Sequence, residues 1–325
     1  GVRRAQVLLA EAEIASKRRE LAYEVDQAST QMMASRAKLS VGRNLAKLNT
    51  EIVDFMRPLV ERGEASPLDV TQVELTGRSL QQKLASLENA ERQQALRLAR
   101  LLGIDPKQTV RIKRGLQLPL TRPAPAPLSD EQLFRRRPDH LMNLAQHDVA
   151  GAEALLDHAE RWEAIALKVF VVRDQSVDEP DGLDTNTFTG IGVSIPLPLR
   201  QRNENAIEQA RIDIEAAEKS RSAREFHIRS EYEAALLAAR DAHSLALEAS
   251  GTVIELAEKN LAEFRATYEQ GLASLLQVQR AQEQLLELHN ASLDFVESYH
   301  LAEALLRFVT SNYPGLDLTS AASAK

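Results

Sequence analysis

The chain carries one short motif twice, each time between long stretches of helix-forming residues. The first copy covers 63–70 and the second 271–278, with Gly, Ala, Ser, Leu and Val at matching positions. With a one-residue slip, the similarity extends upstream to 24–28 and 231–235. A duplication of this size predicts one helix-turn-helix unit used twice, with function in pseudo-symmetric geometry rather than in a single catalytic cleft.

Very long helices are predicted on both sides of each motif. No proline occurs between Pro198 and Pro314, and only Gly251 and Gly271 interrupt strong helix formers. The simplest interpretation is two helices that meet at Gly271, the first covering 203–269 as a rod of roughly 100 Å. In the first copy the predicted helices are 2–61, with Pro58 in the last turn, and 67–102, with Pro67 at the helix start.

Amino-acid composition argues against two classes of protein, globular enzymes and nucleic-acid binders. Hydrophobic residues make up 44% of the chain but aromatics only 4%, which is typical of closely packed helices rather than a globular enzyme core. The net charge is −7 with cations and carboxylates interspersed, so the basic stripe expected of a nucleic-acid binder is missing. The chain has no Cys, which excludes disulfides and is compatible with the periplasm.

Between the two long helical regions the sequence becomes rich in proline. Residues 115–128 hold four prolines and predict an extended connector. Ser129 and Gln132 form a predicted capping box for a helix over 130–160.

Two segments after that helix alternate with period two. In residues 165–173 the odd positions are apolar up to Arg173, and in 187–195 one face carries Ile191, Val193 and Ile195. Each segment is close to the about 9–11 residues that cross a bilayer as a tilted strand. We expect a β-hairpin whose odd face meets lipid and whose even face meets a lumen. An isolated hairpin is unstable and lipid tolerates no open sheet edge, so other copies must close the barrel.

These features together resemble the outer-membrane efflux proteins of the TolC family across essentially the whole chain. Residues 136–139 (Arg-Arg-Pro-Asp) resemble the family's Arg-Pro-Asp motif, 192–199 its strand-to-helix segment and 271–278 its periplasmic tip. Pro196-Leu197-Pro198-Leu199 followed by Arg202-Asn203 is most similar to the CzcC-type heavy-metal components of RND efflux systems.

The resemblance implies a mainly α fold of very long antiparallel helices in two tandem repeats, of the α-barrel type, with a β-hairpin that contributes to a trimeric transmembrane β-barrel. The expected parts are a first-repeat hairpin over 1–103, a connector over 104–128, a helix over 129–161, a β-hairpin over 162–199, a second-repeat hairpin over 200–313 and a tail over 314–325. Because the family has a second β-hairpin and the first repeat begins inside its long helix, we expect that the chain is truncated at its N-terminus.

The implied function is that of the outer-membrane channel of a tripartite efflux system, which exports metal cations or small toxic compounds. The implied partners are a homotrimer's other subunits, a periplasmic adaptor, an inner-membrane RND-type transporter and outer-membrane lipid, in a Gram-negative outer membrane with a periplasmic extension. The resemblance places the adaptor at both tips, where the glycines turn the chain, Ala and Ser leave room for a partner helix, and the apolar residues anchor the tip in the bundle. These residues are Gly63, Ala65, Ser66, Leu68, Val70, Gly271, Ala273, Ser274, Leu276 and Val278.

Beyond the second tip, some relatives carry carboxylates that form a cation-binding ring. Here Gln277 and Arg280 occupy the corresponding positions, although the first copy has Asp69. An acidic gate ring is therefore not expected.

Other candidate sites have simpler interpretations. His140, His147 and His158 lack the i, i+4 spacing of a chelating helix, so we interpret them as surface histidines rather than metal ligands. The carboxylates of 174–184 favour a solvated hairpin loop with Gly182 at a turn, and Arg135 to Arg137 favour pairing with neighbouring carboxylates. No cofactor site, nucleophile-base set or phosphate loop is found in the sequence, so no enzymatic activity is expected. The rival interpretation is a soluble coiled-coil scaffold.

Overall fold

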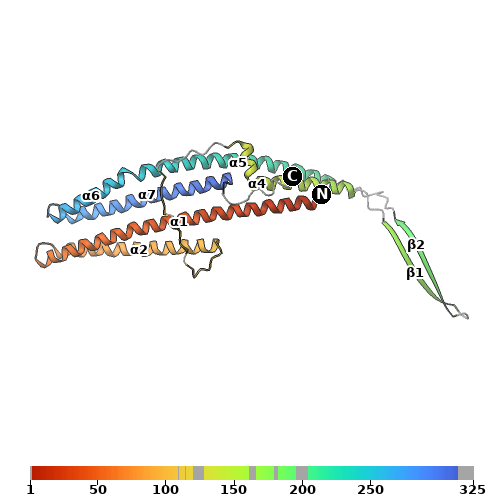
Figure 1. Cartoon of the computed structure of the whole chain (residues 1–325), viewed down its shortest axis with the longest axis horizontal. Coiled ribbons are helices and arrows are strands. Elements are labelled where there is room, and N and C mark those ends of the chain that lie inside the picture. The colour runs from red at the N-terminus through yellow and green to blue at the C-terminus, as the bar shows by residue number, and fades with distance from the viewer. Residues whose placement is uncertain are drawn as a thin grey trace. The chain divides into compact units, whose positions relative to one another are not determined.

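The computed structural model describes residues 2–108, 110–113, 115–119, 128–160, 166–178, 182–194 and 204–313. These residues are mainly helical, and the elements follow one another as drawn in Figure 1. Their bounds are α1 Val2–Glu61, α2 Pro67–Leu101, α3 Asp130–Arg136, α4 Pro138–Glu160, β1 Ala166–Asp178, β2 Gly182–Ser194, α5 Glu204–Ala249, α6 Thr252–Glu269 and α7 Leu275–Thr310.

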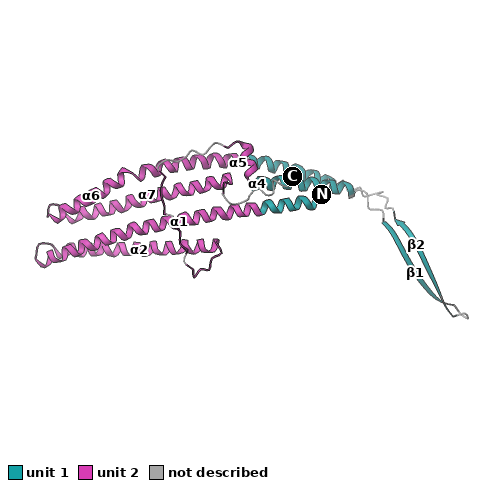
Figure 2. Cartoon of the chain, in the orientation of Figure 1, with its two compact units in different colours: residues 1–13, 138–226, 321–325 teal, residues 14–137, 227–320 magenta. Residues whose placement is uncertain are grey.

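The chain divides into two compact units, which Figure 2 colours separately. One consists of residues 14–137 and 227–320, and is called the helical unit here. The other consists of residues 1–13, 138–226 and 321–325, and is called the hairpin unit. Each unit is assembled from segments that are distant in sequence, because α1 and α5 each run through both.

In the helical unit, the hairpin α1–α2 packs against the hairpin α6–α7 (Figure 1). A buried cluster joins the two near their turns, with Met56 and Val73 from the first hairpin and Leu261 and Val278 from the second. This cluster is the tip core. An ion pair between Arg265 and Glu51 (3.1 Å) and a hydrogen bond from Gln279 to Thr76 (3.2 Å) add contacts between the hairpins. Both turns therefore lie at the same end of this unit.

The predicted helix over 2–61 is confirmed, since α1 is a single helix of 60 residues. At the helical rise this is roughly 90 Å, a length that requires packing along its whole course. Pro58 removes one backbone donor but lies in the last turn, so α1 continues to Glu61. The predicted helix over 67–102 is observed as α2, with Pro67 in its first turn.

The single rod predicted over 203–269 is wrong. The helix ends at Ala249 and resumes at Thr252, with Gly251 in a non-helical conformation (φ −100°, ψ −128°). Glycine has the lowest helix propensity after proline, which favours a break at this position. The Ser250 hydroxyl also donates to the Ala246 carbonyl and lies within hydrogen-bond distance of the Ser292 hydroxyl, and such side-chain bonds compete with the helix.

The single helix predicted over 130–160 is also wrong, because Arg137 separates α3 from α4. A residue that precedes proline is pushed out of the helical region by the ring of that proline, and Arg137 is extended (φ −90°, ψ 114°). The predicted capping box of Ser129 and Gln132 is present at the start of α3.

The described part of the predicted connector is not helical and lies on the helical unit. Leu116 and Leu118 pack against a buried cluster that includes Val296 and Tyr299, next to the α5 residue Ala246. His300 Nε2 lies 2.9 Å from the Gln117 carbonyl oxygen and His243 Nε2 3.0 Å from that of Pro119. Residues 120–127 lie outside the described residues.

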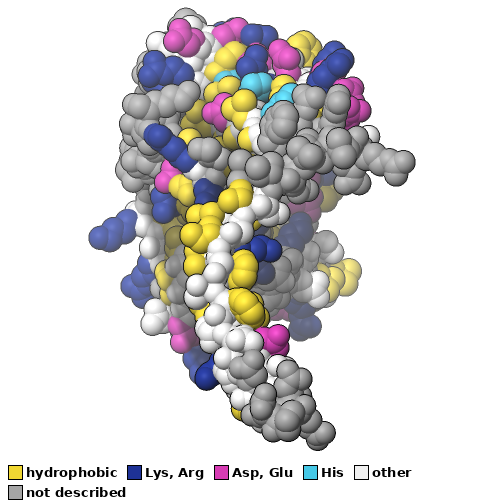
Figure 3. Space-filling view, turned by 90° about the vertical axis from the view of Figure 1, so that its right-hand side faces the viewer, with side chains coloured by type: hydrophobic (Ala, Val, Ile, Leu, Met, Phe, Trp, Pro, Cys, Tyr) yellow, Lys and Arg dark blue, Asp and Glu magenta, His cyan; other side chains and the backbone are white. Residues whose placement is uncertain are grey.

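The predicted β-hairpin is observed in the hairpin unit as β1 and β2, two antiparallel strands of 13 residues each. Leu167 pairs with Val193 and Val169 with Ile191, so these apolar side chains share one face, as predicted. The other face carries Phe170 opposite Gly190, and the ring would lie 2.6 Å from a Cβ at that glycine, so the small residue makes room for the aromatic one. Hydrophobic side chains follow the hairpin on its surface (Figure 3). Ile165 and Ile195 lie outside the described residues.

Candidate functional site

The two tips of the helical unit have the same backbone geometry. Gly63 and Gly271 both adopt the left-handed conformation, with φ of 73° and 74°. The Gly63 N–H donates to the Val60 carbonyl (3.0 Å) and the next N–H to the Leu59 carbonyl (2.8 Å). The corresponding bonds at the second tip run from Gly271 to Tyr268 and from Leu272 to Thr267, both 2.9 Å. This is the Schellman arrangement, in which glycine ends a helix without steric cost.

Each tip then starts its second helix at a serine. The Ser66 hydroxyl accepts a hydrogen bond from the Leu68 N–H (3.2 Å) and caps α2. At the second tip the Ser274 N–H donates to the Gln277 side chain (2.8 Å), so α7 is capped from its own first turn. Ala65 and Ala273, between glycine and serine, are half-buried and leave little bulk above the turn.

The predicted anchoring role is correct for only half of the apolar tip residues. Val278 is fully buried in the tip core, and Val70 packs against it. Leu68 and Leu276, however, are 78% and 54% exposed. Residues two apart on a helix point to nearly opposite sides, so Leu68 and Val70 cannot both face inward, and neither can Leu276 and Val278.

The structure also identifies a tip residue that sequence reasoning missed. Leu272 is 77% exposed at the second tip, next to exposed Leu276. At the matching position the first tip has Glu64, which pairs with Arg62 (3.1 Å). The backbones of the two tips are alike, but at this one position the second tip exposes an apolar side chain and the first a charged one. The signal was present in the sequence as the mismatch between Glu64 and Leu272.

Contacts below the tips hold the hairpins in place. Arg57 pairs with Glu74 across α1 and α2 (3.0 Å), and the rings of Phe55 and Tyr268 meet edge to face at 6.5 Å. Burial, with a smaller contribution from the charge of Asp69, raises the pKa of Tyr268 above its usual value, so its hydroxyl stays neutral. Below the tips, the uncharged aromatic rings of Phe55 and Tyr268 therefore pack together, and the Arg57–Glu74 ion pair lies nearby.

The histidines do not form a shared site. His140 is buried between α4 and α5, with Nε2 3.2 Å from Glu225, so the expectation of a surface side chain was wrong for it. His147 instead lies 4.0 Å from Asp148, and His158 is exposed. Within the described ranges, no group of three or more His, Asp or Glu side chains is arranged to hold a metal ion.

The acidic and basic clusters also differ from their predicted settings. Asp174, Asp178 and Asp184 lie in the strands rather than in a loop, because β1 extends to Asp178 and Gly182 turns the chain with φ 93°. Glu179 and Asp181 lie outside the described residues. Of the three arginines, Arg137 is buried and its Nη1 lies 2.7 Å from Glu231 and 3.5 Å from the Val309 carbonyl, which confirms carboxylate pairing for this residue.

A family model for outer membrane efflux proteins matches residues 2–104 and 131–312, which is most of the chain and includes both tips. The chain belongs to the outer membrane efflux protein family. Members of this family are channel proteins rather than enzymes, and the family places the chain in the outer membrane with a periplasmic extension. They form trimeric channels that work with adaptors and inner-membrane transporters. No curated protein sequence matches the chain significantly.

Solved structures share the fold of this efflux family member. A membrane protein from Pseudomonas aeruginosa superimposes with a TM-score of 0.76 at 18% identity, covering 94% of this chain and 71% of that one. The channel CusC gives 0.75 at 18% identity over 94% and 72%. The open outer membrane channel MtrE of Neisseria gonorrhoeae gives 0.71 at 14% identity over 94% and 70%. Among the helices that the structure describes, none is both long and apolar enough to cross a membrane.

Proposed function

We propose that this chain is the outer-membrane component of a tripartite efflux system, and that it exports metal cations or small toxic compounds through a homotrimeric conduit. A periplasmic adaptor, itself bound to an inner-membrane RND-type transporter, docks on the two tips of the helical unit. The proposed mechanism is gating rather than catalysis. The helix pairs slide around Gly63 and Gly271 to widen the conduit, and adaptor binding favours this wider state.

The geometry of the tips is the observation that carries this proposal. Two turns with matching hydrogen bonds lie at one end of the helical unit and expose Leu68, Leu272 and Leu276. Leucines that are this exposed at the tips contribute little to packing within the chain. A helical hairpin of a partner that covers them would bury apolar surface.

The β-hairpin supports the membrane part of the proposal. Leu167, Val169, Ile191 and Val193 share one face and are all exposed. A water-soluble sheet would cover such a face, whereas lipid stabilises it. The two strands also leave open edges, which further strands from the same and other subunits would pair in a closed barrel.

The first test is a charge placed at the second tip. Ala273→Arg puts a bulky cation where a partner helix must approach, so we expect export to be lost while the helical circular dichroism and the native mass in detergent stay unchanged. Ser298→Arg, at an exposed position of α7 away from the tips, is the matched control and should export normally. Normal export by Ala273→Arg would refute docking at this tip.

Substrate class needs a separate experiment. In a strain that lacks the full-length protein, sensitivity to a panel of divalent cations, dyes and detergents is compared with and without the gene. Rescue by the gene against cations alone would assign a metal exporter, and rescue against organic compounds alone would assign a drug-type exporter. A full-length product that is water-soluble without detergent would favour the coiled-coil scaffold over the conduit.

A further inference from the structure

The proposed lipid-facing side of the β-hairpin carries an arginine where its apolar run stops. The odd positions of Leu167–Val171 are apolar, and the next residue on that face of β1 is Arg173, which is exposed. In the strand pair Arg173 lies opposite Thr187, and Thr185 and Thr189 are on the same face. The apolar band therefore gives way to a guanidinium beside threonine hydroxyls.

The carboxylates of the described strands occupy the other set of positions. Asp174, Asp178 and Asp184 have even numbers, and the register pairs even positions with even ones. Arg173 has no ion-pair partner among the residues that the structure describes. Within the described hairpin, the face assigned to lipid thus has a positive charge with no carboxylate to balance it.

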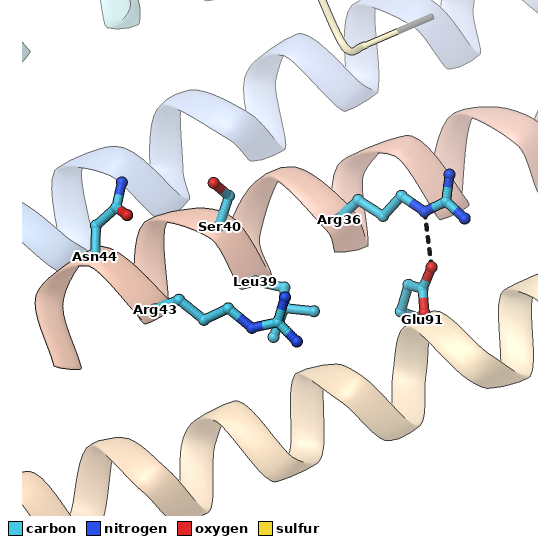
Figure 4. A pocket seen from close by; sticks show the side chains of 6 residues that line it. All are labelled: Arg36, Leu39, Ser40, Arg43, Asn44 and Glu91. Carbon is cyan, nitrogen blue, oxygen red and sulfur yellow. Dashed lines mark hydrogen bonds and ion pairs between the residues drawn. The ribbon is translucent and has the colours of Figure 1, made fainter. Parts of the chain in front are cut away.

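Arginines on the helices differ from Arg173 in this respect. Arg36 pairs with Glu91 (2.7 Å) at the edge of a pocket between α1 and α2, as Figure 4 shows. Arg43 lines the same pocket and pairs with Glu88 (2.8 Å). On a face that meets lipid, an arginine is destabilising near the middle of the bilayer and is tolerated near its surface. Arg173 therefore has to find its anion at the membrane surface.

The position of Arg173 along β1 agrees with the outer membrane surface. Ala166 and Ser194 lead along the chain to α4 and α5, so the proposed function puts the turn at Gly182 on the extracellular side. From Leu167 to Arg173 the strand rises about 20 Å along its length, or roughly 15 Å in height at the usual tilt. The apolar band of such barrels is about 25 Å tall, so Arg173 lies in its outer half. Its long side chain can extend further outward while the stem stays among apolar groups.

We propose that Arg173 binds the phosphate of an outer-leaflet lipid, whose acyl chains lie along the apolar side chains of the same face. The planar guanidinium offers a fork of N–H donors that matches two phosphate oxygens, and the Thr187 hydroxyl opposite can donate to a third. In a Gram-negative outer membrane, lipid A supplies such phosphates. The inference rests on the proposed membrane role of the hairpin and adds a lipid site to it.

Binding of lipid A to the purified full-length protein tests this site. The trimer is extracted and washed in an uncharged detergent, lipid A with both phosphates is titrated in, and bound lipid is counted by native mass spectrometry. Arg173→Gln should weaken binding about tenfold, because it removes charge-assisted hydrogen bonds. Arg173→Lys keeps the charge but loses the fork, so its affinity should lie between those of Arg173→Gln and the wild type.

The same strand offers a matched control. Lys168 is exposed at an even position of β1, opposite Gly192, so Lys168→Gln removes a cation from the other face. This variant should bind lipid A as the wild type does. Arg173→Gln binding as tightly as the wild type would overturn the inference, and so would an equal loss in both variants, because that would indicate a general effect of charge.

Two further arms identify the source of the phosphate. Lipid A stripped of its phosphates should bind the wild type about as weakly as intact lipid A binds Arg173→Gln. Inorganic phosphate in excess should not displace intact lipid A, because it lacks the acyl chains that cover the apolar face. Displacement by inorganic phosphate would indicate a site for the free ion and would overturn the lipid assignment.

The outcomes separate this inference from the function on which it rests. A detergent-requiring trimer whose binding of lipid A ignores Arg173 overturns the site but leaves the conduit in place. If Arg173→Gln lowers the thermal stability of the lipid-free trimer and leaves lipid binding unchanged, the arginine pairs with a neighbouring strand and the lipid site is overturned. A full-length protein that is water-soluble without detergent overturns both.

Discussion

Arg137 and Glu231 form an ion pair whose two members have unequal access to water, and this inequality predicts an unequal response to mutation. The Arg137 side chain is 2% exposed and the Glu231 side chain 31%. Glu231 also has His227 within 3.0 Å, whereas Arg137 lies enclosed at the junction of α3 and α4. Removing one partner of a buried pair costs about 3–5 kcal/mol when the other charge stays buried without compensation.

Glu231→Gln leaves the guanidinium enclosed and short of its carboxylate. Because Glu231 is partly hydrated, we expect the lower end of that range, about 3 kcal/mol of unfolding free energy. Arg137→Met leaves the Glu231 carboxylate in contact with solvent and with His227. The methionine side chain fills most of the volume that the arginine occupied. Its expected cost is about 1–2 kcal/mol.

Urea unfolding of the purified protein in detergent, followed by helical circular dichroism, measures both costs. Arg43→Met is the matched control, because its pair with Glu88 is exposed and its loss should cost less than about 1 kcal/mol. The reasoning is refuted if Arg137→Met costs as much as Glu231→Gln, or if neither exceeds the control.

Three further substitutions have expected outcomes that the same unfolding assay checks. Gly271→Ala should cost about 1–2 kcal/mol because of its positive φ, whereas Gly151→Ala, in an open helical position, should be neutral or stabilising. Gly77→Ala should cost about 1–3 kcal/mol, because its Cβ would lie 2.7 Å from the Asn49 amide, and Asn49→Ala added to it should recover part of the loss. Burial raises the pKa of Asp26 more than its ion-pair partner lowers it, so its ionisation opposes folding as pH rises through that raised pKa. Asp26→Asn should therefore gain stability relative to the wild type at neutral pH, and this gain should vanish below the unfolded pKa; a gain that persists in acid would contradict the assignment.

Much of the helical architecture was predictable because its signals are local. The ends of α1 and α2 follow from Pro67, from the glycine after the first helix and from uninterrupted helix formers. Both helices that were predicted too long end at a local breaker, the first at Gly251 and the second at the proline after Arg137. The strand pairing was also predicted, since alternation specifies which residues share a face.

The tips were located correctly but described incompletely. A motif that repeats in two copies marks a turn, yet it does not say which of Leu68 and Val70 faces the core. Helical geometry requires that one of them faces outward, and the packing of the tip core selects Val70. The role of the tips in adaptor docking stays a prediction until the export assay is done.

Sequence by itself determined most of the places where the chain forms helix, turn and strand, because propensity, capping and periodicity act over a few residues. Only the tertiary structure decided which charges are satisfied within the chain. Glu74, Glu88 and Glu91 of α2 pair with arginines of α1, whereas Arg78, Lys83 and Arg100 have no ion-pair partner among the residues that the structure describes. No local pattern distinguishes a paired glutamate from an unpaired one, because the difference depends on which helix lies beside it.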